Sequence, residues 1–307
     1  MIYDNYGRPT INLRVSVTQK CNLRCEYCHR EGEVASKREM TVDEIVRIVR
    51  IALELGINHV KITGGEPLIR PDILEIVEGI NGLEGVKDLS MTTNGTLLAD
   101  KAEGLRKAGL VRVNISLPTL NPEKFKSLSG GNLEDVIEGI EAAVEAGLNP
   151  VKLNMVILQS FNEDEVESLI KFAAKTHAIL QVIELEPINM DWKYYSTHHY
   201  ALNGLEDMLS KRAEKVETRP YMQNRRVYVL PETRVEVIRP IENTEFCAHC
   251  TRLRVTSDGR LKPCLMRNDN LVDILTPLRA GAEDEVLKGI FIKAIKRREP
   301  YYKTRRK

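Results

Sequence analysis

The stretch Cys21-Asn22-Leu23-Arg24-Cys25-Glu26-Tyr27-Cys28 comes soon after a hydrophobic run at residues 11–17 that is typical of a β-strand. A structural zinc site takes four protein ligands, and a ferredoxin-type cluster takes four cysteines. Three thiols within eight residues therefore leave one metal position open to a substrate or a second cofactor. A zinc site with His29 as its fourth ligand stays open as the alternative.

A second trio of cysteines, Cys247, Cys250 and Cys264, repeats this odd count near the other end of the chain. These are all six cysteines of the 307 residues, and no cysteine lies between the two trios. A disulfide framework would be unusual in a chain of this size, so two metal sites are the better interpretation. A zinc ribbon with His249 as its fourth ligand is the alternative for the second trio.

Composition limits the classes of protein that the chain can belong to. Hydrophobic residues make up 42% and the net charge is +1, which permits a large core and excludes a uniformly basic nucleic-acid surface. No apolar run approaches the roughly 18 residues that span a bilayer, and the first residues lack the apolar region of a secretory signal. We expect a cytoplasmic protein that binds neither membrane nor nucleic acid.

Strand and helix patterns alternate six times along the first part of the chain. Helix starts are predicted at the capping box Thr41-x-x-Glu44, at Pro71 and at Asn162-x-x-Glu165. This alternation predicts a parallel sheet, either open and doubly wound or curved into a barrel. The six strands are expected at residues 11–17, 60–63, 88–92, 111–116, 151–158 and 180–185.

The pattern changes after about residue 221. Two β-hairpins are predicted, one turning at Pro231-Glu232 and the other at residues 257–259. A basic amphipathic helix is expected from Glu283, with residues 293–298 and 303–307 as a solvated face and tail. We therefore predict two domains, residues 1–222 and residues 223–307.

The first trio, with an aromatic residue just before its third cysteine, resembles the signature of the radical S-adenosylmethionine superfamily. In that superfamily a [4Fe–4S] cluster chelates S-adenosylmethionine through its open iron. The motif Gly64-Gly65-Glu66-Pro67 matches a second superfamily motif, and it follows a predicted strand, as other candidate residues do. Active sites of α/β barrels lie at such strand ends, which favours a barrel. The resemblance implies S-adenosylmethionine contacts from Tyr27, Gly65, Glu66, Asn94, Ser116 and Glu186.

The second trio, with Arg252-Leu253-Arg254 between its second and third cysteines, resembles the GTP 3′,8-cyclase family of molybdenum cofactor biosynthesis. Residues i and i+2 of a strand share a face, so the two guanidinium groups project together and suit phosphate oxygens. The resemblance implies an α/β fold, an incomplete (βα)6 TIM-like barrel with a C-terminal α+β extension that carries a second [4Fe–4S] cluster. It also implies GTP contacts from Arg14, Lys61, Thr92, Lys152, Arg252, Leu253 and Arg254.

The family resemblance implies conversion of GTP to (8S)-3′,8-cyclo-7,8-dihydroguanosine 5′-triphosphate, with an electron donor, a downstream enzyme and a homodimer as expected partners. The sequence departs from the family at three places. Bacterial members often have arginine where Lys61 and Gln181 stand, and commonly end in two glycines where this sequence has Arg305-Arg306-Lys307. Two alternatives remain: a radical enzyme with an auxiliary cluster that acts on a peptide, and a non-enzymatic scaffold stabilised by metal.

Overall fold

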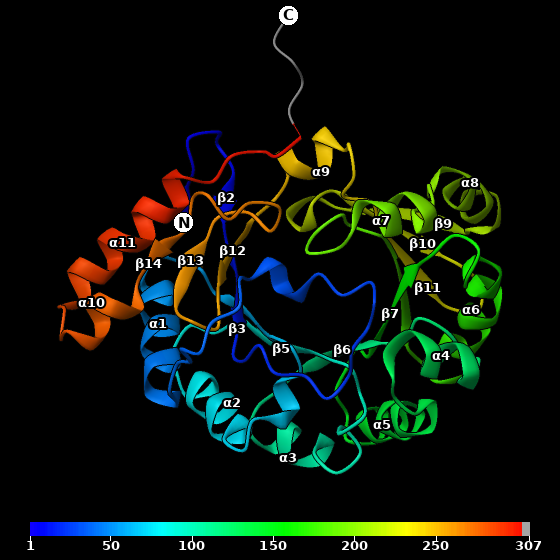
Figure 1. Cartoon of the computed structure of the whole chain (residues 1–307), viewed down its shortest axis with the longest axis horizontal. Coiled ribbons are helices and arrows are strands. Elements are labelled where there is room, and N and C mark those ends of the chain that lie inside the picture. Colours follow the sequence, from blue (N-terminus) through cyan, green and yellow to red (C-terminus); the bar gives the residue numbers. More distant parts are fainter. Residues whose placement is uncertain (303–307) are drawn as a thin grey trace, which may run out of the picture.

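The computed structural model describes residues 1–302, and a curved sheet forms its centre (Figure 1). Within these residues the sheet has twelve strands in the order β14-β13-β12-β3-β4-β5-β6-β7-β8-β11-β10-β9, and no pairing joins β14 to β9. The six central strands are parallel and follow chain order, so the expected incomplete (βα)6 barrel is confirmed. They are β3 (Asn12–Ser16), β4 (His59–Thr63), β5 (Asp88–Thr93), β6 (Arg112–Ser116), β7 (Lys152–Ile157) and β8 (Ile179–Glu184).

Helices cover the outer face of these strands (Figure 1). The predicted capping box is present at the first one, where the Thr41 hydroxyl accepts from Glu44 N and the Glu44 carboxylate accepts from Thr41 N. The helix α4 was not predicted, although Asn121 caps it and Pro122 opens it. The outer helices are α1 (Val42–Glu54), α2 (Ile73–Asn81), α3 (Ala102–Lys107), α4 (Pro122–Ser129), α5 (Leu133–Glu145) and α6 (Val166–Lys175).

Two predicted helix starts are wrong. Helix α2 begins at Ile73 rather than Pro71, because the Arg70 guanidinium binds the Asp72 carboxylate and holds this segment as a turn. Asn162 does not cap α6, because its side chain bonds Pro118 O, Val156 O and Leu158 N. The capping pattern at this position serves the loops beside the helix instead.

The C-terminal part of the chain extends both edges of the barrel. The two predicted hairpins are confirmed: β10 (Arg225–Val229) pairs with β11 (Arg234–Ile238), and β12 (Arg252–Val255) pairs with β13 (Arg260–Lys262). Strand β11 joins β8 and β12 joins β3, both in parallel. The remaining elements are β1 (Ile2–Tyr3), β2 (Pro9–Thr10), α7 (Trp192–His198), α8 (Asn203–Arg212), β9 (Lys215–Arg219), α9 (Thr244–Ala248), β14 (Val272–Asp273), α10 (Leu275–Arg279) and α11 (Asp284–Lys296).

The expected C-terminal helix is present as α11, and its basic face is only partly solvated. Lys293, Lys296 and Arg297 are exposed, whereas Arg298 is buried against the N-terminal hairpin, in which β1 pairs antiparallel with β2. The expectation was therefore wrong for Arg298. Residues 303–307 lie outside the described residues. The boundary near residue 222 stays a prediction.

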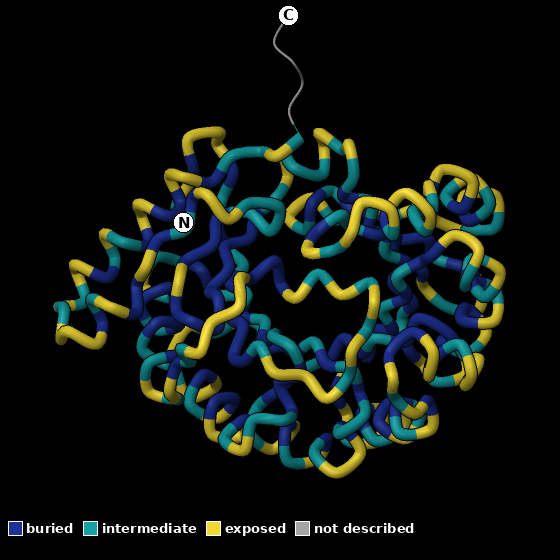
Figure 2. Tube along the Cα trace, in the orientation of Figure 1, coloured by how far each residue is buried: buried dark blue, intermediate teal, exposed yellow. Residues whose placement is uncertain are grey.

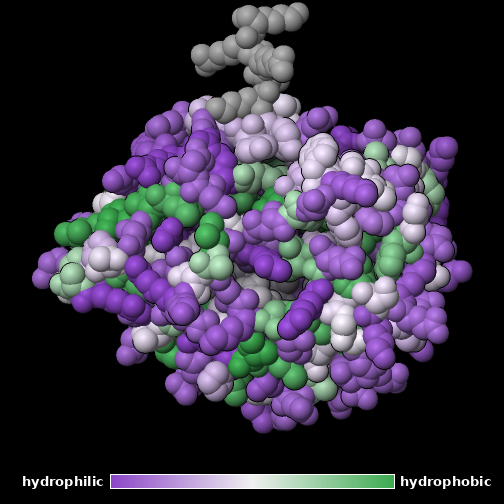
Figure 3. All heavy atoms as spheres, in the orientation of Figure 1, coloured by the Kyte–Doolittle hydropathy of each residue, from purple (hydrophilic) through white to green (hydrophobic). Residues whose placement is uncertain are grey.

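Alternation along the strands separates a core from a polar interior. In β3, Leu13 and Val15 are buried in the core against the helices, while Arg14 faces inward. In Figure 2 the buried trace follows the strands, while the exposed trace follows the outer turns and the loops that cross the middle of the view. The face drawn in Figure 3 is mostly hydrophilic, with hydrophobic patches toward its left and lower edges. None of the helices within residues 1–302 combines the length and the apolar composition that crossing a membrane requires.

Candidate active site

A cavity of about 300 Å³ lies inside the curve of the sheet. The inward-facing side chains of all six barrel strands line it, together with the loops that follow them and the inner face of β12. All six cysteines also line it. The two trios, far apart in sequence, therefore face one shared cavity.

The loop after β3 carries the first trio and is held by the loop after β4. Gly65 N donates to Thr18 O at 2.7 Å and Glu66 N donates to Lys20 O at 2.8 Å. A Cβ on Gly65 would lie 2.2 Å from Lys20 O, so only glycine permits this approach. The two glycines of the second motif thus place the cysteine loop.

The sulfurs of the first trio lie among hydrogen-bond donors. Leu23 N and Arg30 N each lie 3.4 Å from the sulfurs of Cys21 and Cys28, respectively. Burial, with the neighbouring Cys28 and Cys21, raises the pKa of the Cys25 thiol to about 12. Three adjacent thiolates repel one another, so this site suits a cationic group bound to all three.

Most residues predicted to contact S-adenosylmethionine line the same cavity as the first trio. Tyr27, Gly65, Asn94, Ser116 and Glu186 line the cavity. The side chain of Glu66 is fully buried, and its carboxylate accepts from Leu68 N, Thr93 Oγ1 and Asn94 N. Burial raises the pKa of Glu66 to about 6 despite these bonds.

The second trio is placed by α9 and by two arginines from distant parts of the chain. Cys250 N donates to Cys247 O at 3.3 Å within the loop. Arg8 Nη1 donates to Cys247 O at 2.8 Å, and Arg298 Nη2 donates to Cys250 O. The carbonyl groups of two ligating positions are therefore fixed from outside the loop.

The donor sets fit two clusters that each have three thiolate ligands. His29 Nδ1 accepts from Glu31 N at 2.9 Å, and His249 Nδ1 lies 3.0 Å from Glu245 O, so the remaining nitrogen of each ring is Nε2. In the described part of the chain, no three His, Cys, Asp or Glu side chains are grouped to hold a single metal ion. Each trio presents three sulfurs to the cavity, as a [4Fe–4S] cluster with one open iron requires.

Cations from four strands line the same cavity as the two trios. Arg14, Lys61, Lys152, Arg252 and Arg254 all line the cavity, with Thr92 beside them. Burial lowers the pKa of Arg252 well below its ordinary value, and the neighbouring Arg14, Arg225 and Arg254 add to this. Such a group of desolvated like charges favours a polyanionic ligand. Leu253 is the exception among the predicted contacts, because its side chain lies in the hydrophobic core.

A buried carboxylate organises one side of this cationic group. Glu236 accepts from Lys152 Nζ at 2.7 Å and from Gln181 Nε2, and it lies 3.3 Å from Arg225 Nη1. Burial alone would raise the pKa of Glu236, but Lys152, Arg225 and Arg219 hold it well below its ordinary value.

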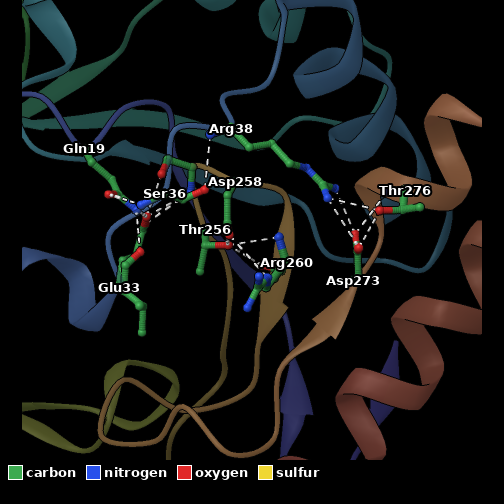
Figure 4. A network of polar contacts seen from close by, with 11 residues as sticks. Gln19, Glu33, Ser36, Arg38, Thr256, Asp258, Arg260, Asp273 and Thr276 are labelled. Atoms are coloured by element: carbon green, nitrogen blue, oxygen red, sulfur yellow. Dashed lines mark hydrogen bonds and ion pairs between the residues drawn. The ribbon is translucent and has the colours of Figure 1, made fainter.

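Polar contacts join the loop of the first trio to the C-terminal hairpin. Figure 4 shows Glu33 between Gln19 and the turn that contains Thr256 and Asp258. The Glu33 carboxylate accepts from Ser257 Oγ at 2.7 Å and from Gln19 Nε2 at 3.0 Å. Lys262 Nζ donates to Gly32 O at 3.0 Å. Because β13 leads into Cys264, the loops of both trios are tied together.

Sequence reasoning missed Arg225, Glu236, Arg8 and Arg298. A signal existed for Glu236, because Val235 and Val237 alternate with it and point to the core. Arg298 gave no signal, because it lies in a basic run that is otherwise exposed.

Comparisons with known proteins agree with this geometry. Family models described as "Radical SAM superfamily" and "Molybdenum Cofactor Synthesis C" match residues 15–173 and 178–304. A probable GTP 3′,8-cyclase of Thermococcus kodakarensis is 51% identical over 99% of this chain and 100% of its own. One of Methanococcus vannielii is 47% identical over 98% of this chain and 99% of its own.

Solved structures share the fold at lower identity. SuiB of Streptococcus suis, bound to S-adenosylmethionine, has a TM-score of 0.62 at 18% identity, covering 95% of this chain and 70% of its own. The fold, the paired cysteine trios and the full-length relatives lead to one conclusion. This chain belongs to the GTP 3′,8-cyclase family of radical S-adenosylmethionine enzymes.

Proposed function

We propose that this chain converts GTP to (8S)-3′,8-cyclo-7,8-dihydroguanosine 5′-triphosphate, the first step of molybdenum cofactor biosynthesis. The names of the full-length relatives support the reaction. The observation that carries the proposal is the meeting of two thiol trios and a buried cationic group in one cavity.

In this proposal Cys21, Cys25 and Cys28 hold the first cluster, and S-adenosylmethionine lies against it. When bound, these groups supply the one-electron cleavage chemistry that starts the reaction. Glu66 acts through its backbone, because its carboxylate already binds the loop after β5. The remaining contacts come from Tyr27, Gly65, Asn94, Ser116 and Glu186.

Cys247, Cys250 and Cys264 hold the second cluster, and the cationic group holds the triphosphate of GTP. Arg252 and Arg254 project from one face of β12 into the cavity, where both are buried. Arg14, Lys61, Thr92 and Lys152 complete the contacts, and Leu253 contributes through its backbone. The chain's task is to orient GTP and exclude water.

The proposal also includes a one-electron donor, a downstream enzyme that uses the cyclic product, and a homodimer. A cytoplasmic location is proposed because all six cysteines are free, which suits a reducing compartment.

Anaerobic incubation of the reconstituted protein with GTP, S-adenosylmethionine and dithionite tests the reaction. We expect a nucleotide of unchanged mass, because cyclisation is an isomerisation, that elutes apart from GTP, together with 5′-deoxyadenosine and methionine. Recovery of unaltered GTP from protein that holds both clusters and cleaves S-adenosylmethionine would refute the reaction.

The double substitution Arg252→Ala and Arg254→Ala tests the substrate site. Each lost charge-assisted contact is worth about 1.5–3 kcal/mol, so GTP affinity should fall at least about 100-fold while S-adenosylmethionine cleavage persists. Arg226→Ala is the matched control, because Arg226 lies on the exposed face of β10. Unchanged GTP affinity by titration in the double variant would remove this pair from the site.

A further inference from the structure

Arg298 is a buried cation directly behind the second trio. Only 1% of its surface is exposed, although the neighbouring Arg297 is exposed. Its Nη2 donates to Cys250 O, and its Nη1 donates to Thr10 Oγ1 and, at 3.3 Å, to Pro9 O. The segment that follows α11 is thereby fastened to the cysteine loop and to the N-terminal hairpin.

Arg8 makes the equivalent contact from that hairpin. Its Nη1 donates to Cys247 O at 2.8 Å, and its Nε lies 2.8 Å from Asp4 Oδ2. Asp4 Oδ2 also lies 3.5 Å from Arg298 Nη1. We call Asp4, Arg8 and Arg298 the rear triad. Its two guanidinium groups share one carboxylate, so it places a net positive charge behind two cysteines.

Pairing within the rear triad is incomplete. Arg298 Nε is buried and has no hydrogen-bond partner in the described structure. An underpaired buried cation is costly, so its presence beside a cysteine loop points to an anionic group on the other side.

We propose that the rear triad is a positioning unit for the second cluster, which fixes the carbonyls of Cys247 and Cys250 and raises the cluster's reduction potential through its net positive charge. Hydrogen bonds, net charge and burial set the potential of iron–sulfur clusters. Groups behind the ligands also affect retention, since their loss typically costs 10–100-fold in metal affinity. The inference rests on the second cluster of the proposed function.

Two substitutions with opposite changes in charge test the proposal. Both are made in a chain whose first trio is replaced by alanine, so that only the second cluster contributes to the signal. Arg298→Gln removes a positive charge, and we expect a more negative midpoint potential and about tenfold faster iron release to a chelator. Asp4→Asn removes the shared negative charge with little change of shape, and we expect a more positive potential.

EPR-monitored redox titration and the iron and sulfide content per chain are the measurements. Arg298→Lys should restore much of the potential, and Arg297→Gln, on the exposed neighbour, should match the parent chain. Structural damage alone would not shift the two charge variants in opposite directions. Shifts of the same sign, or no shift in Asp4→Asn, would overturn the proposal even where Arg298→Gln fails to fold.

These outcomes are separate from the test of the overall reaction. Full-length wild-type protein that holds both clusters but leaves GTP unaltered would refute the proposed function, while the potentials would still decide the role of the rear triad.

Discussion

Single residues inside the barrel act mainly through charge, and Glu236 shows this best. It is one carboxylate that meets Lys152, Arg225 and Arg219. At position 181 a glutamine donates to Glu236 and accepts from Asn114 at 2.7 Å. An arginine at that position would add a fourth cation to the same carboxylate, which explains why a neutral amide suits this chain.

The substitution Glu236→Gln should destabilise the protein by about 3 kcal/mol at pH 7, because it leaves buried cations without their partner. The folded pKa of Glu236 lies below its ordinary value of 4.5, so its stabilisation is complete above about pH 4.5 and is lost as the pH falls. Urea unfolding should therefore show that the difference in the free energy of unfolding between the wild type and the variant becomes smaller below about pH 4.5.

The exposed Glu214 provides the control, since Glu214→Gln should leave stability nearly unchanged. If the loss in the free energy of unfolding caused by Glu236→Gln is the same at every pH, the charge of the Glu236 carboxylate does not stabilise the fold.

At the same scale, the site could be predicted only where residues belong to motifs. The cysteines and Arg252 were identified from spacing and strand alternation, and the structure brings them to one cavity. Arg225 and Arg8 could not be predicted, because their roles depend on which strands become neighbours. Leu253 shows that a matching position in a family motif does not ensure a side-chain contact, since alternation along the strand turns the Leu253 side chain away from the cavity.

Among the elements, the loop after β4 has the strictest geometric requirement. Gly64 has a φ of +151° and lies against Thr18, and Gly65 lies against Lys20. Backbone atoms occupy the space that side chains would need, so these contacts cannot be relieved by a rotamer change. The loop after β4 thus helps to fix the position of the first trio, which the loop after β3 carries.

The substitution Gly65→Ala should displace the first cysteine loop, because the new Cβ would lie 2.2 Å from Lys20 O. We expect loss of the iron at the first trio and of S-adenosylmethionine cleavage, with iron at the second trio retained. Iron content per chain and EPR measure this. Gly289→Ala is the control, since nothing lies within 4 Å of a Cβ there, and an unaltered first cluster in Gly65→Ala would contradict the expectation.

Elements with strong periodicity were predictable and those fixed by loops were not. The Thr41 capping box and both hairpins are present as expected. The patterns at Pro71 and Asn162 failed because tertiary bonds took the groups that would have capped a helix. Local sequence indicates which bonds a side chain can make, whereas the fold decides which it does make.

Over the whole molecule, one sheet continues from the barrel into the C-terminal part on both edges. β8 hydrogen-bonds to β11 and β3 hydrogen-bonds to β12. Buried residues of both parts join in one large hydrophobic core. Separating the two parts would expose a parallel strand at each edge of the barrel.

We therefore expect residues 1–222 and 223–307 to unfold together. Hydrogen exchange measured along a guanidinium titration should show β5 and β13 losing protection at the same denaturant concentration. Two separate transitions would show that the predicted boundary near residue 222 divides independent folding units.

Glu33 and Lys262 hold the two thiol trios at a fixed spacing, because each joins the first cysteine loop to the hairpin that leads to Cys264. The spacing between the two trios is therefore fixed, and a ligand that contacts both must match this spacing in length. A shorter molecule would reach only one trio, and a longer molecule would not fit between the two. Selection by length thus accompanies selection by charge.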